Sequence, residues 1–237
     1  MRLSSPIYKL KRQARLMARE KQIKLHAALD QIATTEGFQN WGHLAARYAQ
    51  TTPAQHILTQ LDGGDLVLIA ARPGQGKTLL GLELSAVAVK HNQTGCFFTL
   101  DYTAADVREQ LLALGVNPEA LGHHHIVDVS DNISAAYIIA RLNLLPKVTL
   151  VVVDYLQLLD QKRSNAPLET QVRALHAFAK KTGIIIAMIA QIDRAFEQSP
   201  DRFPSIQDVR LPNPLDLSLF DKRCFLHAGD IQIEKAA

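Results

Sequence analysis

Residues 66–78, LVLIAARPGQGKT, decide the fold of this 237-residue chain. The run Leu66–Ala71 is wholly apolar, which is typical of a strand buried on both faces of a parallel sheet. Gly74 and Gly76 lie in the turn that follows, and helix-forming residues begin at Thr78. A buried strand, a glycine-rich turn and a helix in this order predict a loop whose backbone N–H groups converge on phosphate oxygens at the positive end of the helix.

The side chains of this loop fit a nucleoside triphosphate with its metal ion. Lys77 can reach the β- and γ-phosphates, and the Thr78 hydroxyl is placed to bind Mg²⁺. The standard pattern begins with glycine where this chain has Ala71, whereas the half GQGKT is intact; a plain turn that joins strand to helix is the alternative. We expect ATP to be held by the loop and the first helical turn, namely Arg72, Pro73, Gly74, Gln75, Gly76, Lys77, Thr78 and Leu79.

From Gly63 onward, short β-rich runs alternate with helical segments, which predicts an α/β, doubly wound, mainly parallel sheet flanked by helices. The expected strands are Leu66–Ala71, Cys96–Leu100, Ile126–Val129, Thr149–Val153 and Ile184–Ala190, with weaker ones at Arg223–His227 and Ile231–Ile233. The expected helices are Thr78–Lys90, Ala104–Leu114, Ser134–Leu144 and Pro167–Lys181.

Three polar residues follow expected strands, at the edge where ligands bind in such sheets. Asp154 is the natural metal partner beside Thr78, unless it only caps the next turn. Asp101 could orient or deprotonate an attacking water, although an aspartate also suits the start of the helix at Ala104. Gln191 could sense the γ-phosphate, with an ordinary polar strand end as the alternative.

The segment Asp193–Pro214 is predicted to be a long loop. It contains three arginines, Arg194, Arg202 and Arg210. A nucleic-acid or partner loop and a plain surface loop are equally compatible with this composition.

Residues 1–50 are predicted to form a basic, all-helical N-terminal region, with nine Lys and Arg against three Asp and Glu. Helices are expected at Tyr8–Lys24, Leu25–Thr35 and Trp41–Tyr48, a linker at 51–62 and the α/β domain at 63–237. The first helix could bind nucleic-acid phosphates, be merely solvated, or dock on a neighbouring subunit. Seven cations lie on it: Lys9, Lys11, Arg12, Arg15, Arg19, Lys21 and Lys24.

Other residue patterns exclude several protein classes. Cys96 and Cys224 cannot form a disulfide framework, which favours a reducing, cytoplasmic location. Three consecutive residues cannot easily converge on one metal ion, so His123-His124-His125 is expected to be a loop that enters a strand. The longest apolar runs are shorter than the roughly 20 residues of a membrane helix, so we expect no membrane span.

Taken together, the motifs resemble the RecA-like P-loop ATPase domain of bacterial replicative helicases of the DnaB type, over roughly Gly63 to Lys235. Residues 71–78 (ARPGQGKT) contain the R-P-x-x-G-K-[ST] part of the loop of that family, and 151–159 (VVVDYLQLL) are close to its hhhIDYLQLh segment. The helix at 167–183 resembles RSLKxLAKE, and 190–194 (AQIDR), 208–211 (DVRL) and 225–227 (FLH) resemble SQLNR, SDLR and FLHR. The resemblance implies that the Gln191 strand lies between the strands of the phosphate loop and of Asp154.

Three departures from this family pattern bear on activity. The family has a catalytic Glu where Asp101 stands, one methylene longer, and displacement of a base by about 1 Å can cost orders of magnitude in rate. The terminal Lys-x-Arg of the family, which acts on the nucleotide of a neighbouring subunit, is Lys235-Ala236-Ala237 here. The primase-binding domain of those helicases has no counterpart, and residues 24–44 instead resemble a small helical module, LHxALDxIAxxxGFxxWxxL. In this module we expect Phe38 and Trp41 to pack a small core rather than to stack on bases.

The leading hypothesis is a Mg²⁺-dependent ATPase of the RecA/DnaB-like type, helicase-like and associated with single-stranded DNA. Lys77, Asp101 and Gln191 would be the catalytic residues, and Thr78 and Asp154 the metal ligands; the family forms rings, so a homo-oligomer is possible. The alternative is a nucleotide-binding switch or adaptor that hydrolyses little or no ATP. A small-molecule kinase is a third and less favoured hypothesis.

Overall fold

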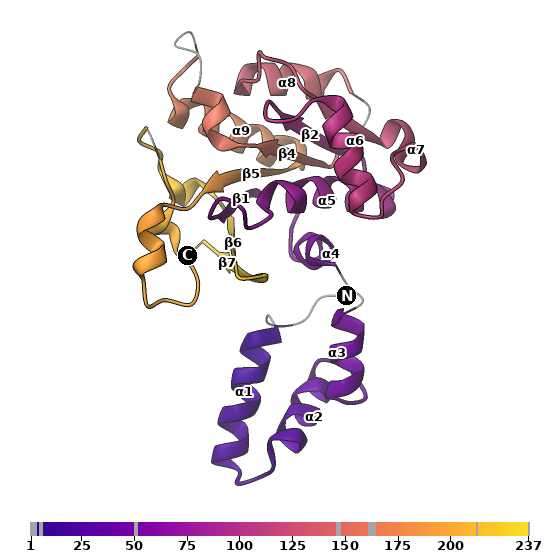
Figure 1. The fold of residues 1–237 in the computed structure, drawn as a ribbon, viewed down its shortest axis with the longest axis vertical. Helices are drawn as coiled ribbons and strands as arrows, with labels where there is room; N and C mark the ends of the chain where they lie inside the picture. The colour runs from indigo at the N-terminus through magenta and orange to yellow at the C-terminus, as the bar shows by residue number, and fades with distance from the viewer. Residues whose placement is uncertain are drawn as a thin grey trace. The chain divides into compact units, whose positions relative to one another are not determined.

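The computed structural model describes residues 4, 7–49, 52–145, 148–160, 165–211 and 213–236 (Figure 1). The chain divides into two compact units, residues 1–60 and 61–237, here called the N-terminal and C-terminal units. No helix in the described ranges has both the length and the apolar character needed to cross a bilayer. The boundaries expected from the sequence, at 50 and 63, stay predictions.

The N-terminal unit is all helical, with α1 (Ile7–Glu20), α2 (Leu25–Thr35), α3 (Trp41–Ala49) and a short α4 (Pro53–Leu58). Leu10 and Ala14 of α1 pack against Ala28 and Ile32 of α2 in one apolar cluster. A second cluster joins three residues of α2, the turn and α3, namely Ala33, Phe38 and Leu44. These clusters confirm that Phe38 and the adjoining Trp41 belong to the small core of the unit.

Several residues of the small helical module fix the packing and the turn of its helices. The backbone N–H of Trp41 donates to Oδ1 of Asp30 at 2.8 Å, which fixes the start of α3 against α2. Gly37 has φ +85°, a left-handed conformation that favours glycine and turns the chain between the two helices. The spacing in this module is therefore explained by its packing.

Helix α4 lies inside the segment that the sequence predicts as a linker. Thr52 is its N-cap and accepts a hydrogen bond from the backbone of Gln55, whose side chain accepts one from the backbone of Thr52 in return. Pro53 occupies the first helical position, where the absence of an N–H has no cost. Pro53 disfavours a helical conformation at the residue before it, but it is well suited to the first position of the helix that follows.

The C-terminal unit is built on a seven-stranded sheet in the order β3-β2-β4-β5-β1-β6-β7. All neighbouring strands are parallel except the antiparallel pair β6 and β7. The strand that ends in Gln191 lies between β1 and the strand that ends in Asp154, as expected. The strand bounds are β1 Leu66–Ala71, β2 Gly95–Thr99, β3 His125–Asp128, β4 Leu150–Asp154, β5 Ile185–Gln191, β6 Lys222–His227 and β7 Asp230–Lys235.

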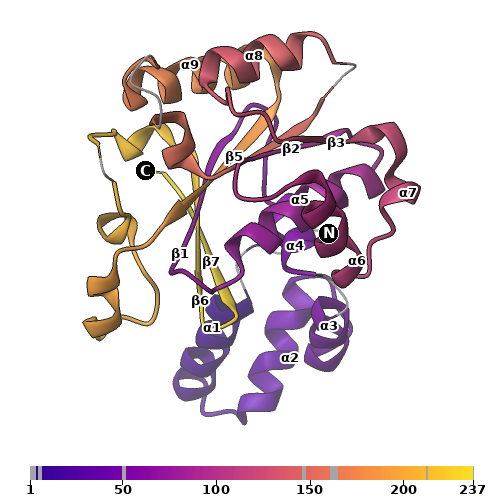
Figure 2. The same cartoon turned by 45° about the horizontal axis from the view of Figure 1, so that its top comes forward.

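Helices cover both faces of this sheet (Figures 1 and 2), with α8 and α9 on one side and α5 and α6 on the other. Their bounds are α5 Lys77–Lys90, α6 Ala104–Ala113, α7 Pro118–Leu121, α8 Ala135–Asn143 and α9 Leu168–Thr182. Short 3-10 helices occur at Gly122–His124, Leu156–Asp160, Arg194–Gln198, Ile206–Asp208 and Leu217–Leu219. The α/β fold expected from the alternating pattern is confirmed.

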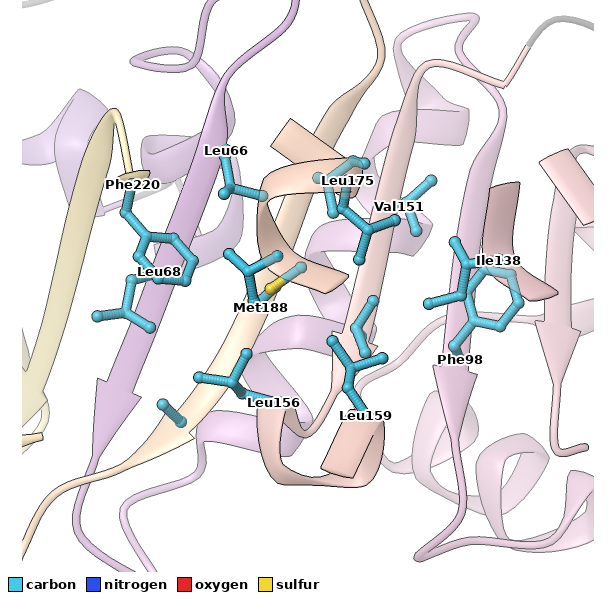
Figure 3. Packing of buried hydrophobic residues seen from close by; sticks show 14 of the residues in the cluster. Leu66, Leu68, Phe98, Ile138, Val151, Leu156, Leu159, Leu175, Met188 and Phe220 are labelled. Carbon is cyan, nitrogen blue, oxygen red and sulfur yellow. The ribbon is translucent and has the colours of Figure 1, made fainter. Parts of the chain in front are cut away.

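The main core lies between the sheet and the pair α8 and α9 (Figure 3). Alternate residues of the central strands, such as Leu66, Leu68 and Met188, point into this layer, to which α9 contributes Leu175. β1 is fully buried along its length because its other face is covered by α5. This double burial explains why β1 has no polar alternation, and it makes the carboxyl edge of β1 a rigid support for the loop that follows.

Candidate nucleotide-binding site

The loop predicted to bind phosphate, residues 72–76, here called the phosphate loop, lies between the end of β1 at Ala71 and the start of α5 at Lys77. Gly74 and Gly76 have φ of +79° and +77°, left-handed conformations that residues with a Cβ rarely adopt. Gly76 is the N-cap of α5 and offers no side-chain cap, so the first N–H groups of the helix are free to bind an anion. Residues 73–76 are exposed, while Lys77, Thr78 and Leu79 are half-buried in the first turn of α5.

Asp154 is the last residue of β4 and is 1% exposed. Burial raises the pKa of this carboxyl group to about 6, and the charge of Asp101 adds to the rise, while a hydrogen bond with the Thr78 side chain and the charge of Lys77 oppose it. Its Oδ2 atom has no hydrogen-bond partner in the described part of the chain. A buried carboxylate with a free oxygen, beside a threonine hydroxyl, is the oxygen-donor set that suits Mg²⁺.

The sequence predicts Asp101 at the end of a strand, whereas the structure places it beyond the end of β2. It still lies close enough to the Asp154 carboxyl group for its charge to act on it. β2 ends at Thr99, which is in register with Asp154 of β4, so Leu100 and Asp101 are outside the sheet. The backbone N–H of Asp101 donates to the Thr99 hydroxyl at 3.2 Å, which turns the chain away from the strand direction. The Asp101 residue is exposed.

Gln191 is the last residue of β5 and is in register with Ala71 of β1. This pairing places the amide-bearing residue next to the residue from which the phosphate loop begins. The expected proximity of Gln191 to the loop is therefore observed, and its role as a sensor stays a prediction.

An open pocket of about 510 Å³ adjoins Gln191 and the phosphate loop. It is formed because the segment after β5 folds back: Ile192 bridges Val209, and the Arg210 N–H donates to the Gln191 carbonyl oxygen at 2.8 Å. The lining residues are Arg72, Pro73, Gln191, Ile192, Asp193, Arg194 and Arg210. The segment predicted to be a long loop thus contributes Asp193, Arg194 and Arg210 to the lining of this pocket.

Two contacts of the phosphate loop were not foreseen. The Arg72 guanidinium forms an ion pair with Glu197 and also donates to the Ile192 carbonyl oxygen at 3.2 Å. The Oε1 atom of Gln75 accepts a hydrogen bond from the backbone of Ala228 at 3.0 Å. The loop is therefore tied on one side to the segment after β5 and on the other to the turn between β6 and β7.

The histidine run leads into a strand, since His123 and His124 lie in a short 3-10 helix and His125 begins β3. Among the described residues, no group of three His, Cys, Asp or Glu side chains could hold a metal ion. His125 lies in β3, and its Nε2 atom makes a 2.9 Å hydrogen bond with the buried hydroxyl of Ser85. Burial lowers the pKa of His125 to about 4, so the ring is neutral and structural.

The family model of the DnaB-like helicase C terminal domain matches residues 50–126 and 118–213, more than half of the chain. The chain belongs to this DnaB-like helicase family. The chain is 28% identical to the replicative DNA helicase DnaB of Geobacillus stearothermophilus over an alignment of 211 positions, which covers 76% of this chain and 46% of that protein. The family resemblance seen in the motifs is confirmed.

Solved structures show the same RecA-like fold. A DnaB-like replicative helicase, studied with its primase interactions, has a TM-score of 0.63 and 18% identity over 97% of this chain and 71% of that one. A solved ATPase domain has a TM-score of 0.59 and 18% identity, covering 81% of this chain and 88% of that one. The DnaB-like chain spans less than half the length of the curated helicases that it matches.

Proposed function

We propose that this DnaB-like chain binds ATP with Mg²⁺ at residues 72–79 and Asp154, and hydrolyses it. The observation that carries the proposal is the buried Asp154 carboxyl group, whose Oδ2 has no partner among the described residues and which interacts with Thr78 and Lys77 in the first turn of α5. An unpaired buried carboxylate is costly unless a cation compensates it. A divalent ion bound with a triphosphate supplies that compensation.

Each residue has a distinct role in this proposal. Lys77 and the N–H groups of 74–78 hold the phosphate oxygens, and Thr78 and Asp154 hold the metal, which supplies charge neutralisation of the phosphates. Asp101 orients the attacking water and accepts its proton. Gln191 contacts the γ-phosphate and transmits its presence to residues 192–211, with which it shares a backbone hydrogen bond.

Replacement of Lys77 tests the proposal most directly. Lys77→Ala should abolish steady-state ATP turnover, because positioning and charge stabilisation supply nearly all the catalysis in phosphoryl transfer. Lys90→Ala is the matched control, since Lys90 is an exposed lysine at the other end of the same helix. Turnover that survives Lys77→Ala and equals that of the control would remove the assignment.

The second candidate function is a nucleotide-binding switch or adaptor with little hydrolysis. It is favoured by the short side chain of Asp101 and by its position in an exposed bend beyond β2. Asp101→Glu should raise turnover at least tenfold if reach limits the base, on the order of the effect of a 1 Å misplacement. Nucleotide binding without turnover in both wild type and Asp101→Glu would support the switch.

We further propose that the protein acts on single-stranded DNA as a helicase-like homo-oligomer in the cytoplasm. Membership of the helicase family supports the DNA and assembly parts of this proposal. Sedimentation with a labelled oligonucleotide and a non-hydrolysable ATP analogue tests both, because complex formation and oligomeric state appear in the same run. A nucleotide-loaded monomer that leaves the oligonucleotide free would contradict both parts.

A further inference from the structure

Helix α1 carries its charge and its apolar residues on opposite faces. At about 100° per residue, Lys11, Arg12, Arg15 and Arg19 fall within an arc of about 100°. Leu10 and Ala14 lie on the opposite side, where they pack against α2. The four cations are all exposed, and they are here called the basic face.

Within the part of the chain that the structure describes, no acidic side chain is paired with the basic face. None of its four side chains makes a hydrogen bond or ion pair with any residue that the structure describes. The one acidic residue of α1 is Glu20, which lies about 80° outside the arc. One exposed face of α1 therefore carries four positive charges that no described residue compensates.

Such an arrangement does not serve the helix itself. Lys11, Arg15 and Arg19 follow one another at a spacing of four residues, and like charges at this spacing destabilise a helix. Arg19, in the last turn, is the one member that favourably opposes the helix dipole. A bound polyanion would turn this repulsion into attraction, which points to a ligand outside the unit.

We propose that the basic face binds the phosphate backbone of nucleic acid, as a second contact outside the ATPase domain; this inference rests on the proposed action on DNA. Lys11 and Arg19 are about 12 Å apart along the axis, a span over which a strand offers several phosphates to long side chains. A bilayer fits poorly, because the apolar face of α1 is already buried against α2 and cannot insert.

The contact is expected to be independent of base sequence. Phe38 and Trp41, the one Phe and the one Trp of this unit, pack in its core and are not available to stack on bases. Contacts between charges then carry the interaction, so we expect a steep dependence of the affinity on salt.

The test compares full-length variants by fluorescence anisotropy with a labelled oligo-dT at several salt concentrations. Replacement of all four cations of the basic face by Gln, a good helix former, should reduce the slope of log K against log salt by about 2.8 for a single strand. Between 50 and 200 mM salt, the wild type should then lose about 50-fold more affinity than this variant. Circular dichroism and the ATP turnover without DNA should be unchanged.

A charge-matched pair of double variants sharpens the comparison. Arg15→Gln with Arg19→Gln should reduce the slope by about 1.4, whereas Lys90→Gln with Lys181→Gln, two exposed lysines of the C-terminal unit, should leave it unchanged. Equal slopes for the two double variants would overturn the proposal. The proposal would also be overturned if the four-fold Gln variant lost binding to anionic vesicles or polyglutamate while its slope of log K against log salt for oligo-dT stayed that of the wild type.

The outcomes separate this inference from the proposed function. Loss of ATP turnover in Lys77→Ala, together with a wild-type salt slope in the four-fold variant, would leave the ATPase standing and refute the basic face. A reduced salt slope in the four-fold variant, together with a wild-type protein that does not turn over ATP, would support the basic face and refute the ATPase.

Discussion

At the scale of single residues, Asp154 carries the largest electrostatic penalty at the site. Its carboxyl group is almost fully buried, and burial raises its pKa to about 6 from an ordinary value of 3.8. The folded state therefore holds this proton more tightly than the unfolded chain. Between about pH 4 and 6, the free energy of unfolding contributed by this group falls as the pH rises, because ionisation of the buried group is unfavourable.

Asp154→Asn should remove this pH dependence. Relative to the wild type without ligand, the variant should gain about 2.4 kcal/mol in the free energy of unfolding as the pH rises from 4 to 7, since one pKa unit corresponds to about 1.4 kcal/mol. Urea unfolding of both proteins at each pH measures the difference, in which the shared titrations of other groups cancel. A difference that does not change with pH would show that the carboxyl group is not held protonated by the fold.

At the scale of elements, the pattern of apolar residues in the sequence predicted where most strands lie, but not where each of them ends. β1 was expected with its bounds as found, because an apolar run closed by a glycine turn has one interpretation in an α/β chain. β2 was expected at Cys96–Leu100 but begins at Gly95 and ends at Thr99, since pairing with β4 and not hydrophobicity sets its ends. α4 was missed because six residues are too few to show a helical period.

The site shows the same limit. The loop residues and the strand-end carboxylate follow from local pattern, so residues 72–79 and Asp154 could be named from the sequence. The ion pair of Arg72 with Glu197 joins residues 125 positions apart, and the bond of Gln75 to Ala228 joins residues 153 apart. No local pattern encodes such pairs, because only the fold brings them together.

The packing of α5 on β2 gives a prediction at this scale. A Cβ on Gly95 would lie 2.0 Å from the carbonyl oxygen of Ser85 in α5, so helix and strand would both have to shift. Gly95→Ala should cost at least about 3 kcal/mol, at the upper end of overpacking effects, and lower the melting temperature by about 6–12 °C. Gly63→Ala is the control, because its nearest atom is 3.3 Å away and the site is exposed. Equal melting temperatures for both variants would contradict the close approach.

At the scale of the whole molecule, two separate cores imply two stabilities. The main core of the C-terminal unit contains buried residues from five strands (β1, β2, β4, β5 and β6) and from helices α8 and α9, while the described residues of the N-terminal unit form two small clusters. Units of about 60 residues bury a smaller fraction of their surface and are marginally stable alone. We therefore expect the N-terminal unit to unfold at the lower temperature.

The single tryptophan allows the unfolding of the two units to be followed separately. Trp41 is the one tryptophan of the sequence and lies in the N-terminal unit, so its fluorescence reports that unit, whereas calorimetry reports both. ATP with Mg²⁺ at 100 times its dissociation constant should stabilise the unit that binds it by about 2.7 kcal/mol, which corresponds to about 5–10 °C for a domain of this size. The upper calorimetric transition should therefore move, while the Trp41 transition should stay within about a degree. If both transitions move together, the two units unfold in one cooperative transition, and the expectation of two separate stabilities is wrong.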